Sequence, residues 1–331
     1  MFTGACWCLL VFDYAFIGPA RPGPAATLFE PVQAGEPHLA GRVVLAPLAR
    51  SRSPNAVAGP FAARCYSQRA SGGLLITEAT AITQQGQGHS AVPGLYGAGQ
   101  SGASRQVTDA VHQAHGKIVG QLWHVGRVCH TDLQPDNGAP VAPSAIAAKT
   151  KTVLIKNGKP EFVDTCLPRA LRAQELPGMA HRYRVAARSA VQTAGFDGVE
   201  IRGVNGYLLD QFLRSSANHR QDDYGGSIEN RARLLPEVTR AVTSAIGGGK
   251  TGIRLRHATS SGRVARPNAP RQCPHAAPPP NSMALALTLA VLTFSDASEL
   301  FCTLRSAGAG VALLQSRLLN RVFKPCSCGL T

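Results

Sequence analysis

Short apolar runs that alternate with segments of helical periodicity constrain the fold of this chain more than any other feature. The runs occupy residues 43–46, 73–77, 117–122, 198–201 and 252–255. Strands that are apolar on both faces are buried on both faces, as in a parallel sheet covered by helices. Repeated alternation of strand and helix therefore predicts an α/β protein, whose parallel sheet is either doubly wound or closed as a barrel.

Two segments carry the clearest helical pattern. In residues 177–194, apolar side chains recur on one side, and Gly195 follows where a glycine commonly ends a helix. The second pattern begins after Ser227 and contains Pro236. Because proline breaks the interior of a helix, we expect Pro236 to lie in a first turn.

The chain divides into three regions by composition. Residues 1–26 are rich in glycine, proline and alanine and lack periodicity, whereas residues 27–255 carry the strand and helix patterns. Residues 256–331 are first rich in proline and arginine and then in leucine and alanine. No further alternation of strand and helix is recognisable after residue 255.

The positive charge does not indicate a nucleic-acid-binding protein. The formal net charge is +15, and residues 256–331 supply +6 of it. The remaining basic residues are scattered, without the clusters and interleaved aromatic side chains that nucleic-acid-binding surfaces show. We therefore expect no nucleic-acid partner.

The cysteines and the apolar runs outside the strand pattern bear on location. The nine cysteines are unevenly spread, and no histidine stands at metal-ligand spacing beside either C-x-C pair. This pattern favours reduced thiols over a disulfide framework, and no metal site is expected. The apolar runs at residues 8–12 and 283–294 are too short to span a bilayer. The prediction is a cytoplasmic protein without a membrane segment.

Polar residues stand at the carboxyl ends of the predicted strands. Examples are Glu78, Gln121, Trp123, His124, Arg202 and Arg254. In a (βα)8 barrel, such positions converge on one mouth, where the chemistry takes place. Any one of them is more often a structural polar group, but the set together indicates a site.

Several motifs stand in a fixed order along the chain. The longest is NGYLLDQFL at residues 205–213, followed by NHRQDDYGGSIENR at residues 218–231. The others are GRVVLAPL at 41–48, QLWHVGR at 121–127, APVAPSAI at 139–146 and GFDGVEI at 195–201. In order and spacing, over about two thirds of the chain, these motifs resemble the old yellow enzyme and 12-oxophytodienoate reductase family of flavin-dependent ene-reductases.

The resemblance implies a (βα)8 TIM barrel that carries FMN and is reduced by NADPH or NADH. Because five strands do not close an eight-stranded barrel, we expect this barrel to be incomplete after the fifth strand and to be followed by an atypical tail. It implies that the chain reduces the C=C bond of an α,β-unsaturated carbonyl compound. The positions that match the family's flavin contacts are Pro47, Leu48, Ala49, Ala79, Gln121 and Arg254. By the same resemblance, Tyr207 donates the proton, and Arg202 and Asn205 bind the substrate carbonyl.

The sequence departs from the family pattern at three site positions. Arg202 stands where the family carries histidine, Ala49 replaces a common hydroxyl residue, and His89 replaces an aromatic one. After Arg254 no phosphate-binding loop is recognisable, and residues 308–317 resemble the family's final strand only weakly. Two hypotheses follow: an FMN-dependent enone reductase, or a non-catalytic family member with impaired FMN binding. The sequence does not indicate the oligomeric state.

Overall fold

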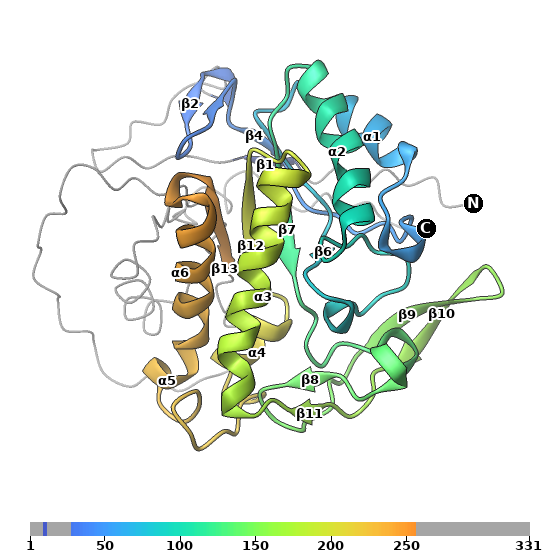
Figure 1. The fold of residues 1–331 in the computed structure, drawn as a ribbon, viewed down its shortest axis with the longest axis vertical. Coiled ribbons are helices and arrows are strands. Elements are labelled where there is room, and N and C mark those ends of the chain that lie inside the picture. The colour runs from blue at the N-terminus through green and yellow to red at the C-terminus, as the bar shows by residue number, and fades with distance from the viewer. Residues whose placement is uncertain (1–8, 12–27, 256–331) are drawn as a thin grey trace, which may run out of the picture.

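The computed structural model describes residues 9–11 and 28–255 (Figure 1). Its main sheet has the strand order β1-β4-β5-β7-β12-β13, with β6 (Thr80–Ala81) also paired to β7. The five central strands are β4 (Val43–Leu45), β5 (Leu74–Ile76), β7 (Ile118–Trp123), β12 (Gly198–Gly203) and β13 (Thr251–Leu255). All five run parallel, at the places where the apolar runs predict strands. The short β1 (Leu9–Val11) pairs with β4 in the antiparallel direction.

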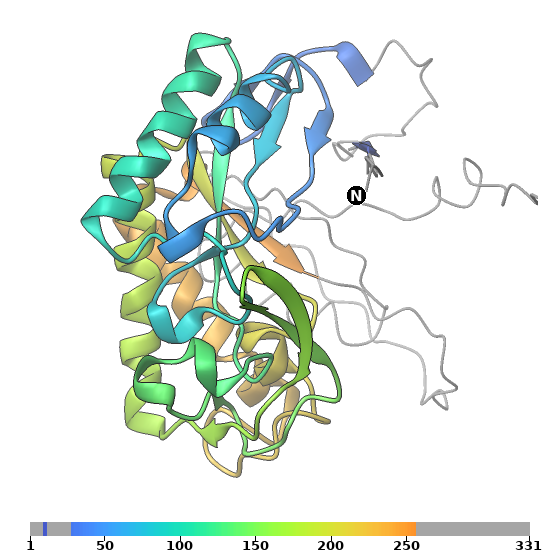
Figure 2. The ribbon, with the colours of Figure 1, turned by 90° about the vertical axis from the view of Figure 1, so that its right-hand side faces the viewer.

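The order of the strands and the place of the helices distinguish a barrel from a doubly wound sheet. From β4 to β13 the parallel strands are neighbours in the order in which the chain makes them, without a reversal. Figure 2 shows the long helices α2 (Ala98–Gln113), α3 (Leu176–Arg188) and α6 (Leu234–Ile246) as one layer on one face of the sheet. A doubly wound sheet reverses its strand order and carries helices on both faces. The described strands therefore form part of a barrel wall.

The boundaries of the helices agree with the positions of glycine and proline in the sequence. The predicted helix at residues 177–194 is confirmed, with its last turn, Ser189–Thr193, widened to a π-helix. Gly195 follows at φ +77°, a conformation that suits glycine. The pattern after Ser227 forms two helices, α5 (Ile228–Ala232) and α6, and Pro236 lies in the first turn of α6, as predicted. The other helices are α1 (Pro60–Ser67) and α4 (Leu208–Leu213).

Alternate residues of each strand face opposite sides of the sheet, and the two sides differ in chemistry. Residues such as Leu75, Leu122 and Ile201 face the helices and join one large apolar core with Met179 and Val238. This outer face is apolar along the strands, which explains why the strands read as continuous apolar runs. Burying a side chain of this size stabilises the fold by about 1.5–3 kcal/mol.

The inner face is apolar only at the amino ends of the strands. There Val44, Leu74, Ile76 and Val119 form a small cluster. A hairpin of β2 (Val32–Gln33) and β3 (His38–Leu39) supplies Leu39 to the same cluster. Towards the carboxyl ends, the inner face changes from apolar to polar residues, which places a site there.

Shorter strands gather beyond this end of the sheet, at the bottom of Figure 1. The antiparallel hairpin of β9 (Lys151–Lys156) and β10 (Lys159–Asp164) turns at Asn157 and Gly158, both with positive φ. Next to it, β8 (Val141–Ala142) pairs in parallel with β11 (Arg169–Ala170). The sequence analysis did not predict these elements.

Within the described residues, no helix is both long and apolar enough to cross a membrane. Cys65, Cys129 and Cys166 are free thiols in that part of the chain. Burial raises the pKa of the Cys129 thiol to about 12, which keeps it protonated and unreactive at neutral pH. The predicted tail at residues 256–331, the segment 308–317 within it and most of residues 1–26 lie outside the described residues.

Candidate functional site

The register of three neighbouring strands places four polar side chains on the inner face. In the pairing of β12 with β7, Glu200 stands opposite Gln121. In the pairing of β12 with β13, Arg202 stands opposite Arg254. Glu200 and Arg202 are two residues apart on one strand, so their side chains leave the same face. The strands themselves thus bring together residues that are 133 positions apart in the sequence.

These four side chains form one connected polar network. Arg202 donates from Nη1 to Oε1 of Gln121 at 2.7 Å. Gln121 donates from Nε2 to Oε1 of Glu200 at 2.5 Å. Arg254 Nη1 lies 3.9 Å from the same carboxylate oxygen. Because Glu200 is 2% exposed and Gln121 is fully buried, the network is fixed before any ligand arrives.

Aromatic rings surround the Arg202 guanidinium. Its Cζ atom lies 4.7 Å from the ring centroid of Tyr207 and 5.9 Å from that of Trp123. The two rings meet edge to face, with their centroids 5.1 Å apart. His89 stacks on Trp123 with ring centroids 5.7 Å apart, so two rings pack against the cation and a third backs one of them. Such cation–π contacts strengthen when water is excluded.

Burial and charge set the protonation of the groups in this site. Burial raises the pKa of the Tyr207 phenol, and the nearby Arg202 partly opposes this rise. Burial lowers the pKa of the His89 imidazole, and Arg202 lowers it further. Burial also raises the pKa of Glu200, against the pull of Arg254 and the bond from Gln121. At neutral pH, Tyr207 is therefore a protonated phenol and His89 a neutral imidazole.

The turn after β12 positions Tyr207. Asn205 and Gly206 adopt positive φ angles of 64° and 73°, which reverse the chain before α4 begins. Tyr207 is the residue before α4, and its carbonyl accepts from the Gln211 N–H at 2.8 Å. The Gln211 side chain donates to the carbonyls of Gly206 at 2.7 Å and Val125 at 2.9 Å, which ties the turn to the segment after β7. Asn205 itself is exposed on this turn.

The remaining predicted flavin contacts follow β4 and β5. Leu48 is 62% exposed, an unusual state for a leucine beside a parallel strand, and its neighbour Ala49 is also exposed. Pro47 is half-buried. Ala79, 2% exposed, belongs to a small cluster with Trp123 and the partly buried Tyr207.

His124 does not join the site, although it also ends a predicted strand. It is one residue beyond Trp123 and therefore leaves β7 on the opposite face. Its Nδ1 accepts from the Gly126 N–H at 3.1 Å, and burial lowers its pKa to about 3. The sequence analysis placed it at the convergent mouth, which the alternation along the strand contradicts.

One member of the site, Glu200, is absent from the residues predicted for it. Glu200 links Gln121 to Arg254 and is the centre of the network. A glutamate inside the apolar run 198–201 is a signal that could have identified it, because a buried carboxylate needs partners. Trp123, which the sequence analysis placed at the convergent mouth, stands two residues after Gln121 and so lies on the same face.

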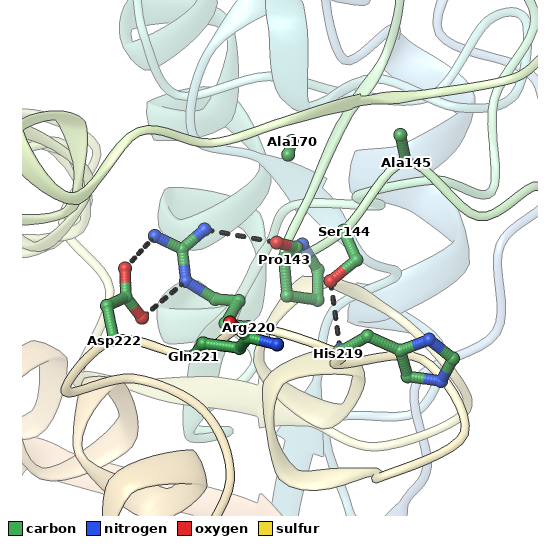
Figure 3. A pocket seen from close by; sticks show the side chains of 8 residues that line it. All are labelled: Pro143, Ser144, Ala145, Ala170, His219, Arg220, Gln221 and Asp222. Carbon is green, nitrogen blue, oxygen red and sulfur yellow. Dashed lines mark hydrogen bonds and ion pairs between the residues drawn. The ribbon is translucent and has the colours of Figure 1, made fainter.

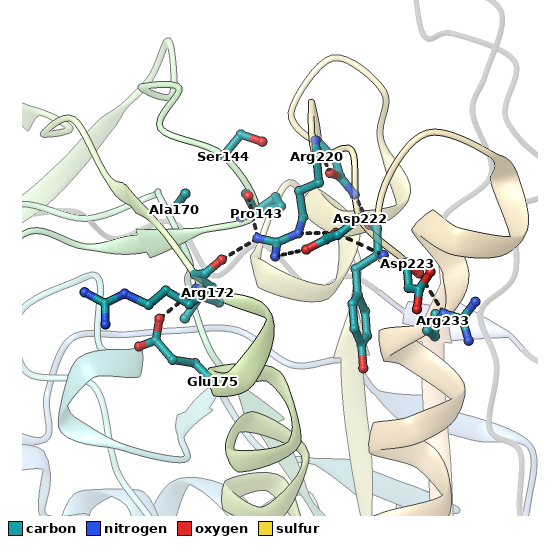
Figure 4. A network of polar contacts seen from close by, with 12 residues as sticks. Pro143, Ser144, Ala170, Arg172, Glu175, Arg220, Asp222, Asp223 and Arg233 are labelled. Atoms are coloured by element: carbon teal, nitrogen blue, oxygen red, sulfur yellow. Dashed lines mark hydrogen bonds and ion pairs between the residues drawn. The ribbon is translucent and has the colours of Figure 1, made fainter.

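A second polar region lies apart from these residues, around Arg220 (Figures 3 and 4). Arg220 donates from Nη1 to the Pro143 carbonyl at 3.0 Å and to the Leu171 carbonyl, and from Nε to Asp222 at 2.9 Å. The bond from Arg220 lowers the pKa of the Asp222 carboxyl. Through these bonds, Arg220 fastens the segment after α4 to the segments that follow β8 and β11.

Beside Arg220 there is an open surface pocket of about 530 Å³ (Figure 3). It is lined by Pro143, Ser144, Ala145, Ala170, His219, Arg220, Gln221 and Asp222. None of the predicted site residues lines it. Within the motif 218–231, the Asn218 side chain donates to the carbonyls of Phe212 and Tyr224, both at 2.7 Å. Much of this motif therefore serves the structure of the loop.

Comparison with known proteins identifies the family. The sequence pattern of the NADH:flavin oxidoreductase / NADH oxidase family, the family of old yellow enzyme, matches residues 27–264. The chain belongs to this family. The parallel strands from β4 to β13 are thus the wall of the (βα)8 barrel of this family, whose cofactor is FMN.

Individual relatives agree with this assignment. The chain is 45% identical to 12-oxophytodienoate reductase 7 of Oryza sativa subsp. japonica over 233 residues, 70% of this chain and 58% of that protein. Morphinone reductase in complex with tetrahydroNAD is 45% identical, with a TM-score of 0.67 over 69% of this chain and 63% of that one. The old yellow enzyme homologue from Zymomonas mobilis is 42% identical, with a TM-score of 0.66 over 70% and 63%. The chain spans about three fifths of the length of the curated relatives it matches.

The described inner face fits the ring of a flavin. Gln121 uses one amide hydrogen and one lone pair within the network, which leaves one of each for a ligand. The pyrimidine edge of an isoalloxazine offers carbonyl oxygens and an N–H, which match the Gln121 amide and the Arg254 guanidinium. A cation beside this edge stabilises the negative charge of a reduced flavin.

Proposed function

We propose that this protein is an FMN-dependent oxidoreductase that reduces the C=C bond of α,β-unsaturated carbonyl compounds with NAD(P)H. The observation that carries the proposal is the arrangement of the inner face. The Gln121 amide and the Arg254 guanidinium share the buried carboxylate of Glu200, and the Tyr207 phenol adjoins the Arg202 end of the same network. The names of the relatives, which are enone reductases, point in the same direction.

When bound, the flavin supplies hydride to the β-carbon of the substrate. Each residue of the site then has a distinct task. Gln121 and Arg254 orient the ring and hold positive charge at its pyrimidine edge, while Pro47, Leu48, Ala49 and Ala79 line its faces and edges. As hydride arrives, negative charge develops on the substrate oxygen. Hydrogen-bond donors fixed in advance at that oxygen lower the barrier, and Arg202 and Asn205 take this role.

Tyr207 donates the proton to the α-carbon. Burial raises its pKa, so the phenol keeps its proton at neutral pH until a basic enolate forms beside it. The Arg202 cation, 4.7 Å from the ring centroid, stabilises the phenolate that remains. Proton transfer from Tyr207 is thus favoured only when the substrate is a negatively charged enolate.

The visible spectrum of the purified full chain, reconstituted with FMN and freed of excess FMN, tests the proposal. A retained flavin absorbance that bleaches on anaerobic addition of NADPH or NADH, and returns on addition of an enone, supports it. A colourless protein after gel filtration refutes it and favours the alternative, a non-catalytic family member with impaired FMN binding.

A further inference from the structure

The site carries more positive charge than a neutral substrate requires. Five ionisable side chains face one another here: Arg202, Arg254, Glu200, His89 and Tyr207. The imidazole and the phenol are neutral at neutral pH, so two guanidinium groups share one carboxylate. The face has a net charge of +1 when Glu200 is ionised and a higher charge when Glu200 is protonated.

The guanidinium of Arg202 also keeps donors that the protein does not use. One of its five N–H hydrogens is donated to Gln121. Its Nε atom is buried and has no hydrogen-bond partner among the described residues. The rings of Tyr207 and Trp123 and the bond to Gln121 hold the group in place. Little side-chain entropy is therefore lost when a ligand binds to it.

A guanidinium and an imidazole select different ligands. A buried neutral imidazole offers one donor to one carbonyl oxygen. A guanidinium presents two parallel donors and a permanent charge, a geometry that matches the two oxygens of a carboxylate. In a face with a net positive charge, the preference for an anion is stronger still, because Arg202 donates to the neutral Gln121 amide and not to a carboxylate of the protein.

From this charge balance we propose that the site selects α,β-unsaturated carboxylates, whose anionic group binds to Arg202, over neutral enones and amides. The inference rests on the proposed function for its reaction, in which the carboxylate takes the place of the ketone carbonyl. The binding preference itself depends only on residues of this chain. Reduction then follows the same steps, with hydride added at the β-carbon and the Tyr207 proton at the α-carbon, and the carboxylate leaves unchanged.

Calorimetric titration of the full chain with trans-cinnamate and trans-cinnamamide tests the proposal. The two probes share one carbon skeleton and differ in charge. We expect cinnamate to bind at least about tenfold more tightly, because one charge-assisted hydrogen bond accounts for that ratio. Arg202→His should reduce the ratio of the two affinities to about one. Arg202→Lys, which keeps the charge but loses the two parallel donors, should give an intermediate ratio.

Arg184→Gln is the matched control, because Arg184 lies on α3 in the helix layer, away from the inner face. It should leave the ratio unchanged. Equal or tighter binding of cinnamamide, or no binding of either probe, overturns the inference, as does a ratio that survives Arg202→His. Flavin reduction by NADPH in the same preparation separates the two proposals. If the flavin bleaches but carboxylates are not preferred, the proposed function stands and this inference fails. If carboxylates are preferred but the flavin is not reduced, this inference stands and the proposed function fails.

Discussion

Removal of the Glu200 side chain should destabilise the protein in a way that depends on hydrogen bonding more than on charge. In Glu200→Ala, the buried Gln121 amide loses its acceptor, which costs about 1–3 kcal/mol. The lost methylene adds about 0.8 kcal/mol. The two arginines, opposite each other in the strand register, also lose the carboxylate between them, at a cost of about 1 kcal/mol. We expect the free energy of unfolding to fall by at least about 3 kcal/mol, the lower end of this sum.

Glu200→Gln separates charge from shape. The glutamine keeps an oxygen that accepts from Gln121 and fills the same volume, but it carries no charge. Because burial raises the pKa of Glu200, the fold already favours the neutral form of this side chain. The change in unfolding free energy should therefore stay below about 1 kcal/mol, as neutral replacements of buried charges often do.

The pH dependence follows from the same pKa shift. A carboxyl whose pKa is raised on folding contributes most below its unfolded pKa, and the contribution is lost as pH rises through the folded pKa. The stability of the wild type relative to Glu200→Gln should accordingly decline as pH rises above about 4.3, the unfolded value for glutamate.

Urea unfolding followed by far-UV circular dichroism measures these effects. With a slope of about 3 kcal/mol per molar urea, Glu200→Ala should lower the midpoint by about 1 M. The control is Glu161→Ala on β10, where Glu161 lies 3.7 Å from Lys156 and both side chains are about half exposed. Its effect should be below about 0.5 kcal/mol. Wild-type stability in Glu200→Ala, or an equal loss in Glu200→Gln, would refute the reasoning.

Three further predictions concern the support of the site. Gly126→Ala should lower stability by about 2 kcal/mol or more, because Gly126 has φ +62° and a β-carbon there would overlap the Gln211 side chain; an unchanged melting temperature would contradict this. Asn218→Ala should cost about 2–3 kcal/mol, because the side chain bridges two carbonyls, and Asn218→Asp should not restore the loss, since a carboxylate donates no hydrogen bond. The hydrogen bond from Arg169 lowers the pKa of Glu175 to about 2. The stabilisation of the fold by this pair should therefore be fully present above about pH 4.3 and lost as pH falls through about 2. In Glu175→Gln, the acid unfolding curve should lack the loss of stability between about pH 4.3 and 2. A curve that matches the wild type would show that the pair contributes nothing to stability.

The sequence predicts the wall of the barrel well because burial on both faces leaves a strong pattern. The five strands are continuous apolar runs, and the helices α3 and α6 carry their apolar residues on one side. The choice between a barrel and a doubly wound sheet required the order of the strands and the place of the helices, which composition does not contain. The family motifs supplied the expectation of a barrel before the structure did.

Other elements left weaker signals. The helix α2, Ala98–Gln113, has little hydrophobic contrast and follows Gly97, which offers no capping side chain. The hairpin of β9 and β10 could have been predicted from the Asn157-Gly158 pair between alternating residues, since this pair is a strong turn signal. The sequence analysis did not use it.

The sequence indicated several residues of the candidate site, but none of the contacts among them. The motifs point to Gln121, Arg202, Tyr207 and Arg254, and the register places the two arginines opposite each other on one face. The bond from Arg202 to Gln121 joins side chains from two strands, and no local sequence pattern encodes it. Glu200 escaped prediction for a related reason, because its role appears only when its two neighbouring strands are aligned.

The comparison of the two half-reactions in Tyr207→Phe tests most directly the claim that this is an ene-reductase with Tyr207 as its acid. Stopped-flow measurement of flavin reduction by NADPH, and of flavin reoxidation by an enone, gives the two rates separately. The account predicts an unchanged rate of flavin reduction and a reoxidation rate that falls by about 10²–10⁴, the usual contribution of a general acid. An unchanged reoxidation rate, or an equal loss in both half-reactions, would contradict it.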